Sequence, residues 1–214
     1  MTEVVVIDYG LGNLHSVQRG FEQCGASVII TSDPARILAA PRVVLPGVGA
    51  FGNAVQELER LGLVEVLRSV AASGKPLLGI CLGMQLLLDE SEEFGIHRGL
   101  SIIPGRVVSL PGTTVEGVPQ KIPHIGWSAL LPAHAEADWQ DSALTGMQPR
   151  DALYFVHSFM AVPQDAADRL ADCIFGGHHV AAVIRRGQVI GCQFHPEKSG
   201  KVGLAILRAF CALE

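Results

Sequence analysis

The sequence predicts an α/β fold, in which a doubly wound, mainly parallel sheet carries helices on both faces and continues into an antiparallel extension. Two observations support this prediction. Up to about residue 80, short apolar runs alternate with segments of helical periodicity over short connections, as in parallel α/β sheets. Beyond about Gly99, five strand-like runs follow one another with turns between them, which favours antiparallel pairing.

The elements of the first half have distinct sequence patterns. Short runs of β-branched residues and leucine indicate strands buried on both faces. Apolar residues at helical spacing indicate the helices between them, and Gly25 is placed to end the first helix. We expect strands at 4–7, 28–30, 43–45 and 77–80, and helices at 14–24, from about 32–34, at 53–61 and at 64–72.

The second half predicts the antiparallel extension and a closing helix. Apolar residues at helical spacing over 202–213 indicate an amphipathic C-terminal helix. Residues 132–150, rich in Pro, Ala, Asp and Gln, are expected to form a loose surface excursion. Without a repeat or a low-complexity linker, residues 1–214 are expected to form one domain. The strands are expected at 106–110, 154–157, 170–175, 181–185 and 189–194.

Composition narrows the functional class. Hydrophobic residues make up 49% and charged residues 17%, and the net charge of −5 arises from interspersed acids and bases. No basic stripe suggests nucleic acid, and the apolar runs are too short to cross a membrane. A strand-like run starting at Val4 leaves no room for a signal peptide. Five scattered cysteines favour neither disulfides nor a zinc site and fit a reducing cytoplasm.

Cys81 is a candidate nucleophile. It lies between a predicted buried strand and a helix, at the carboxyl edge of a parallel sheet, where α/β proteins bind ligands. The flanking Gly79 and Gly83 permit a tight strand-to-helix turn that exposes the nucleophile. The first N–H groups of the helix favour a thiolate there. A buried structural cysteine is the alternative, and this motif alone does not decide between the two readings.

His195 and Glu197 supply what such a cysteine needs. A thiol nucleophile requires an imidazole that takes its proton and later protonates the leaving group. The imidazole in turn requires a third group that orients it. His195 ends an apolar strand, and Pro196 stiffens the short link to Glu197. An isolated His-x-Glu pair is usually surface decoration, but its occurrence together with the cysteine motif predicts a Cys81–His195–Glu197 triad.

These motifs resemble those of the class I (triad) glutamine amidotransferase family. The match rests on Gly-Ile-Cys-Leu-Gly-Met-Gln at 79–85 and Phe-His-Pro-Glu at 194–197. Within the family, Ile-Asp-Tyr-Gly-Leu-Gly-Asn at 7–13, Leu-Pro-Gly-Val-Gly-Ala-Phe-Gly at 45–52 and His-Pro-Glu-Lys-Ser at 195–199 resemble the glutaminase subunits of imidazole glycerol phosphate synthases. The resemblance runs from about Val4 to the C-terminus in the same order.

The expected reaction needs an oxyanion hole with two donors. The backbone N–H of Leu82, directly after the nucleophile, is one candidate by the geometry of the turn. The glycine-rich loop at 46–52 can supply the second, and it lacks the Gly-Lys-Ser/Thr ending of a phosphate-binding loop. The resemblance places that donor at Gly49, with Val48 controlling the orientation of the peptide.

The resemblance also implies residues that bind L-glutamine. Gln85 lies one helical turn beyond Cys81 and matches a substrate-binding residue of the family. Glu93 matches an acid for the substrate's α-amino group, although it belongs to an acidic run that could simply be solvated surface. Ser158 and Phe159 match the strand that contacts the substrate carboxylate.

Other histidines are less suitable for chemistry. His157 is followed by no carboxylate at short range, so we do not assign it as the base. His178 and His179 are adjacent, and adjacent side chains in a strand point to opposite faces. We therefore interpret these two histidines as turn residues and expect no metal site.

The family forms heterodimers with a barrel-shaped cyclase that receives the ammonia. The resemblance suggests Asn13, Trp127 and Lys198 for the partner-facing surface, although Trp127 could instead belong to the core. Ser128 departs from the family's usual Asn, which puts one partner contact in doubt. No metal or organic cofactor is implied. In this reading, ammonia released from glutamine is used by the cyclase to make imidazole glycerol phosphate and aminoimidazole carboxamide ribotide in histidine biosynthesis.

Three alternatives remain open from sequence. The same glutaminase could feed another synthase, such as one that amidates surface sugars, and the co-purifying partner would identify it. The chain could be another cysteine hydrolase on a similar fold, a peptidase or an esterase, which glutamine hydrolysis without peptide cleavage would exclude. It could also be a non-catalytic binding subunit, against which the complete triad argues.

Overall fold

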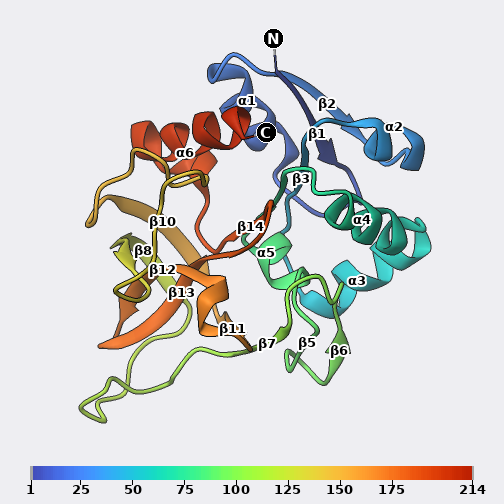
Figure 1. Ribbon diagram of the computed structural model, residues 1–214. Coiled ribbons are helices and arrows are strands. Elements are labelled where there is room, and N and C mark those ends of the chain that lie inside the picture. The colour runs from blue at the N-terminus through green and yellow to red at the C-terminus, as the bar shows by residue number, and fades with distance from the viewer. Residues whose placement is uncertain (1, 214) are drawn as a thin grey trace.

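The computed structural model describes residues 2–213, and a central eight-stranded sheet organises them (Figure 1). The strand order is β2-β1-β3-β4-β14-β13-β12-β9. The first five strands in this order are parallel, and the last three pair antiparallel. The strands are β1 (Glu3–Ile7), β2 (Ser27–Thr31), β3 (Val43–Leu45), β4 (Leu77–Ile80), β9 (Leu131–Pro132), β12 (Arg169–Phe175), β13 (His178–Arg186) and β14 (Val189–Cys192). The predicted parallel sheet with an antiparallel extension is confirmed.

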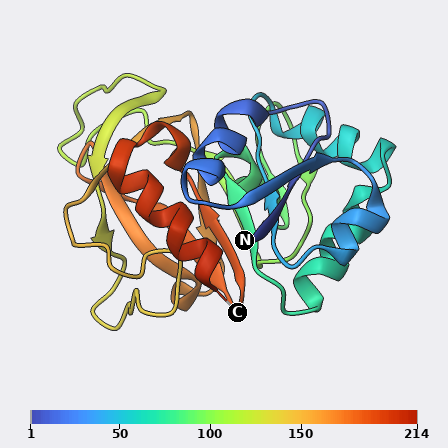
Figure 2. The same ribbon diagram turned by 90° about the horizontal axis from the view of Figure 1, so that it is seen from above.

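Helices cover both faces of the sheet, as a doubly wound fold requires (Figure 2). Successive residues of β1 point to opposite faces, so Val4 and Val6 join one hydrophobic cluster while Val5 and Ile7 join the other. The first cluster contains residues of α1 (Leu14–Gln23) and α6 (Gly200–Ala212). The second contains residues of α2 (Pro34–Ala39), α3 (Phe51–Arg60) and α4 (Leu63–Ala72).

Two smaller sheets lie beside the main one. One has the order β11-β7-β5-β6, and the other pairs β10 with β8. The predicted strands at 106–110 and 154–157 belong to these sheets, so not all of the second half extends the main sheet. Apolar patterning locates strands but does not specify their partners. The strands are β5 (Glu90–Ser91), β6 (His97–Arg98), β7 (Gly105–Ser109), β8 (His124–Ala129), β10 (Ala152–His157) and β11 (Phe159–Pro163), and the short helix α5 (Leu82–Leu86) follows β4.

The prediction of a loose excursion at 132–150 is wrong. This segment contains almost no regular structure but contributes buried residues to the core, among them Trp139, Leu144 and Met147. The indole N–H of Trp139 donates to the carbonyl of Leu170 on β12 at 3.0 Å. Widely spaced apolar residues therefore fasten an irregular segment whose overall composition is polar.

Several strands begin or end at other residues than the sequence predicts. His178 and His179 begin β13 rather than forming a turn, so that interpretation is wrong. His178 bonds to the carbonyl of Thr113 at 2.9 Å, while His179 bonds to Asp172 at 3.1 Å. The strand predicted at 189–194 ends at Cys192, and a 3-10 turn, Pro196–Lys198, precedes α6. Within residues 2–213, no helix is long and apolar enough to cross a membrane.

Candidate active site

Cys81 occupies a strained turn between β4 and α5. Its backbone has φ 55° and ψ −109°, a conformation that a residue with a side chain rarely adopts. Glycine is needed beside it, because a Cβ on Gly83 would lie 1.9 Å from the carbonyl oxygen of Leu45. The Cys81 N–H donates to the carbonyl of Cys192 at 2.7 Å, which fastens the turn to β14. The strain and the close packing hold the thiol at the sheet edge.

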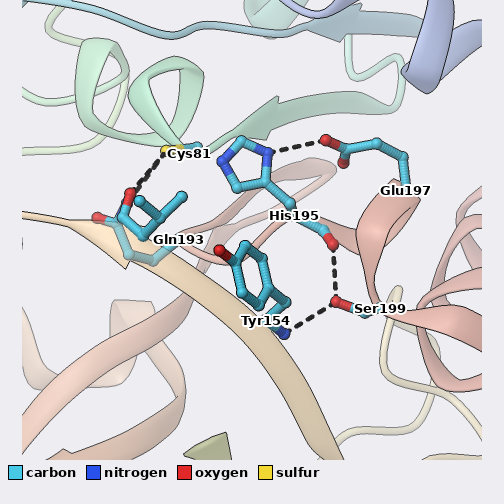
Figure 3. A network of polar contacts seen from close by, with 7 residues as sticks. Cys81, Tyr154, Gln193, His195, Glu197 and Ser199 are labelled. Carbon is cyan, nitrogen blue, oxygen red and sulfur yellow. Dashed lines mark hydrogen bonds and ion pairs between the residues drawn. The ribbon is translucent and has the colours of Figure 1, made fainter. Parts of the chain in front are cut away.

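His195 is positioned through its backbone. Its N–H donates to the carbonyl of Tyr154 on β10 at 3.0 Å. The Ser199 hydroxyl donates to the His195 carbonyl at 2.7 Å and accepts from the Tyr154 N–H at 3.0 Å (Figure 3). Strand β14, strand β10 and the start of α6 therefore meet at this histidine. Sequence analysis did not assign a role to Ser199 or Tyr154.

The imidazole of His195 lies between Cys81 and Glu197 (Figure 3). Its Nδ1 is 2.8 Å from Glu197 Oε1, and the two side chains are only 4% and 1% exposed. Burial alone would lower the pKa of His195, but its hydrogen bonds to Cys81 and Glu197, together with their negative charges, raise the pKa to about 9. His195 is therefore protonated at neutral pH, the state that stabilises a thiolate.

A pocket of about 400 Å³ opens beside the thiol. Most of the residues predicted for catalysis and substrate binding line it, although they come from distant parts of the chain. The pocket also includes Pro123, Val156 and His157. The predicted residues in its lining are Val48, Gly49, Cys81, Leu82, Gln85, Glu93, Ser158, Phe159, His195 and Lys198.

The two candidate oxyanion donors face the same pocket. Leu82 is the first residue of α5, where a helix has backbone N–H groups without helical partners. Gly49 lies across the pocket with φ +99°, a conformation that favours glycine. The loop before it is supported by Tyr9, whose buried hydroxyl donates to the carbonyl of Pro46 at 2.8 Å. This supporting role of Tyr9 was not predicted from the sequence, in which Tyr9 is only part of the motif at 7–13.

Gln85 belongs to a buried amide chain that reaches the thiol. Its Nε2 donates to the carbonyl of Phe159 at 3.0 Å and to Oε1 of Gln193 at 2.9 Å. Gln193 Nε2 then donates to Cys81 Sγ at 3.7 Å (Figure 3). This contact of Gln193 was not predicted from the sequence. The sequence carries no separate signal for it, because Gln193 lies in the bend between the end of β14 and His195.

Glu93 has a structural contact as well as a place in the pocket. Its Oε2 accepts from the backbone N–H of Phe51, the first residue of α3, at 2.6 Å. The carboxylate therefore compensates the positive end of that helix. Glu93 still lines the pocket, where a carboxylate suits a cationic amino group.

His157 lies in the pocket wall but is poorly suited to act as the base. Nδ1 is 2.8 Å from the carbonyl of Phe159, and Nε2 is 3.2 Å from His124 Nδ1. Burial lowers the pKa of His157 to about 4, so this ring is neutral at neutral pH. No carboxylate among the described residues contacts it in the manner of Glu197.

The three predicted interface residues are exposed, and one of them, Lys198, lines the pocket. Trp127 is 58% exposed and packs edge-on against Tyr154, so it is not a core residue. Lys198 lines the pocket mouth, and Asn13 is exposed at the start of α1. Ser128, where the family usually has Asn, contacts His124 Nε2 at 2.9 Å.

The described residues, 2–213, contain no group of three or more His, Cys, Asp or Glu side chains arranged to hold a metal ion. All five cysteines are free, with Cys81, Cys173 and Cys192 buried.

Known protein families and structures resemble this chain over nearly its whole length. The sequence model of the family described as "Glutamine amidotransferase class-I" matches residues 5–212. A solved structure described as a glutamine amidotransferase superposes with a TM-score of 0.69 at 16% identity, covering 94% of each chain, which supports the fold alone. The chain belongs to the class I glutamine amidotransferase family.

Relatives with higher sequence identity show to which subfamily of the amidotransferases the chain belongs. The chain is 49% identical over 210 residues to imidazole glycerol phosphate synthase subunit HisH 1 of Legionella pneumophila (strain Lens), covering 98% of this chain and 99% of the relative. It is also 49% identical to subunit HisH of Syntrophotalea carbinolica, covering 97% and 98%. Within the amidotransferases, the chain therefore belongs with the HisH subunits of imidazole glycerol phosphate synthase.

Proposed function

We propose that this chain hydrolyses L-glutamine to L-glutamate and ammonia, and that it passes the ammonia to the cyclase subunit of imidazole glycerol phosphate synthase in histidine biosynthesis. The observation that carries the catalytic part is the buried Cys81–His195–Glu197 arrangement at the floor of the pocket. Membership among the HisH subunits supports the choice of partner and pathway.

In the first half of the reaction, the Cys81 thiolate attacks the amide carbon of glutamine. The carbonyl oxygen becomes an oxyanion facing the N–H groups of Leu82 and Gly49. His195 gives its proton to the departing nitrogen, the carbon–nitrogen bond breaks, and ammonia leaves. A glutamyl thioester remains on Cys81. Glu197 keeps the imidazole oriented throughout, because its carboxylate is held at Nδ1.

In the second half, the now neutral His195 takes a proton from water as the water oxygen attacks the thioester carbon. The carbon–sulfur bond breaks, L-glutamate is released, and the thiolate–imidazolium pair is restored. The same two backbone donors stabilise both oxyanions. This chain's own residues therefore suffice for both steps.

The residues proposed for substrate recognition surround the thiol with complementary groups. The Glu93 carboxylate is placed to receive the α-amino group, while Ser158 and Phe159 are placed near the α-carboxylate. The Gln85 amide has both hydrogens engaged by protein acceptors, so its oxygen is the atom available to glutamine. These contacts would distinguish free glutamine from a glutamine side chain within a peptide.

We further propose that the cyclase docks over the pocket mouth. Apolar side chains are exposed there, which favours an interface rather than open solvent. Ile125 and Trp127 lie on one face of β8, and Pro123 just before this strand lines the pocket together with Val48. Asn13 and Lys198 are proposed as polar contacts of the same interface. A partner seated here would receive ammonia without releasing it to solvent.

Residues 1–214 are proposed to form one domain acting in the cytoplasm. One central sheet is shared by both hydrophobic clusters, which supports a single domain. Five free cysteines support a reducing compartment.

The proposal is tested by measuring glutamate formation by the purified chain alone and with the cyclase subunit, with and without the cyclase's acceptor substrate. The proposed function requires glutamine hydrolysis, co-purification with the cyclase, and transfer of amide nitrogen from labelled glutamine into the cyclase product. Co-purification with a different synthase that incorporates the label would replace the proposed partner.

A further inference from the structure

We propose that Gln193 is a positioning residue for the nucleophile, donating a side-chain hydrogen bond to the Cys81 thiolate with an amide orientation set by Gln85. This inference rests on the proposed function, because it concerns how the catalytic thiolate is held. Gln193 is fully buried and does not line the substrate pocket.

The local structure aims Gln193 at the sulfur. Its backbone N–H donates to the carbonyl of Ala182 at 2.9 Å, which extends the pairing of β14 with β13 beyond the end of the strand. Gln193 lies in the bend that follows β14, two residues before His195. Gln193 Nε2 contacts the sulfur at 3.7 Å, and the His195 ring lies on another side of Cys81 (Figure 3).

The direction of the Gln193 amide is determined by its neighbours. The carbonyl of Phe159 can only accept, so Gln85 must present its NH₂ group there. The second hydrogen of that NH₂ group goes to Gln193 Oε1. Gln193 must therefore turn its own NH₂ group toward Cys81 Sγ, 3.7 Å away. The backbone carbonyl of Phe159 on β11 therefore determines, through Gln85, that Gln193 presents a hydrogen-bond donor to Cys81.

A donor at this position has a chemical use. Cys81 Sγ also lies 4.0 Å from the carbonyl oxygen of Val156, which suits a thiol but repels a thiolate. The hydrogens of the protonated His195 ring and of the Gln193 amide offset that repulsion. His195 must surrender its proton to departing ammonia, whereas the Gln193 amide keeps its hydrogen throughout. Gln193 therefore remains available to the sulfur when the thiolate leaves the tetrahedral intermediate of the second step.

The test is the pH dependence of Cys81 alkylation by iodoacetamide, followed on the Cys81 peptide by mass spectrometry. Gln193→Met preserves side-chain length and removes the donor. We expect its alkylation midpoint to rise by about half to one pH unit relative to wild type. Gln56→Met, an exposed change of the same type on α3, is the matched control and should leave the midpoint unchanged.

Gln85→Met tests whether Gln85 sets the orientation of the Gln193 amide. It should raise the midpoint by less than Gln193→Met and add nothing when the two changes are combined, because Gln85 acts through Gln193. In glutamine turnover, Gln193→Met should lower kcat with little change in KM, since Gln193 does not touch the pocket.

An unchanged midpoint in folded Gln193→Met would overturn the proposal, as would a shift of equal size in Gln56→Met. If Gln193→Met does not accumulate as folded protein, Gln85→Met takes its place, and an unchanged midpoint there is equally decisive. Alkylation requires no glutamine turnover. A chain that hydrolyses no glutamine would therefore refute the proposed function while leaving the alkylation result standing.

Discussion

The Nδ1 atom of His195 lies 2.8 Å from Oε1 of Glu197, in a pair that is almost wholly removed from solvent. The second oxygen of Glu197 is buried without a hydrogen-bond partner among residues 2–213. The imidazolium of His195 is therefore the main compensation for this carboxylate, which explains why the two groups hold each other in one geometry.

This relationship predicts a ranking of two substitutions. His195→Ala should reduce glutamine turnover by roughly 10²–10⁴-fold, because the proposed acid and base at the thiol is lost. Glu197→Gln should cost less, since it keeps the shape of the side chain and removes only its charge. Steady-state glutamate production by the complex measures both. Wild-type turnover in both variants would show that another histidine, such as His157, is the base.

His157 predicts a dependence of stability on acid. Its pKa is about 4 in the fold because of burial, against an ordinary value of 6.5, so the unfolded chain binds more protons between these values. The wild type should therefore lose stability relative to His157→Gln as the pH falls from about 6.5 to about 4, by up to about 3 kcal/mol. Urea unfolding across this range measures the difference.

The exposed His15 provides the control for that experiment. His15→Gln should follow the wild-type pH profile, because it changes an exposed side chain outside the pocket. Parallel profiles for wild type and His157→Gln would contradict the assignment of a depressed pKa to His157.

The sequence identified those features whose signal is local. Val4–Ile7 and Leu77–Ile80 are buried runs of β-branched residues or leucine. Helices follow such strands along the chain, so the sequence predicts that both strands run parallel within one sheet. Cys81, His195 and Glu197 could be proposed as a triad from the sequence because each chemical role requires a particular residue type near a strand end, and the structure brings His195 and Glu197 within 2.8 Å.

Features that depend on distant partners were not found. Strand β10 looks the same in sequence whether it joins the main sheet or pairs with β8. Trp139 and Leu144 anchor a segment whose polar composition suggested a surface loop. Gln193 is identified only once Gln85 and Cys81, both more than 100 residues away, are placed beside it.

The loop around Gly49 predicts regulation by the partner. We propose that the peptide between Val48 and Gly49 can present or withdraw one oxyanion donor, and losing such a donor typically costs roughly 10²–10³-fold in turnover. We expect low activity for the isolated chain and a large rise when the cyclase carries its acceptor substrate. Glutamate formation under the two conditions gives the ratio.

Two substitutions separate donor loss from backbone strain. Gly49 has φ +99°, so Gly49→Ala and Gly49→Pro both strain the loop, but only proline also removes the N–H. Gly49→Pro should abolish the rise, whereas Gly49→Ala should retain part of it. An isolated wild-type chain already as fast as the activated complex would show that the oxyanion hole is preformed.

The central claim is that Cys81 serves ammonia production and nothing else in the complex. The most direct measurement compares product formation by the Cys81→Ala complex with glutamine and with added ammonium salt as nitrogen source. Synthesis from glutamine should vanish, while synthesis from ammonia should match the wild type. Equal loss of both activities, or retained synthesis from glutamine, would contradict the account.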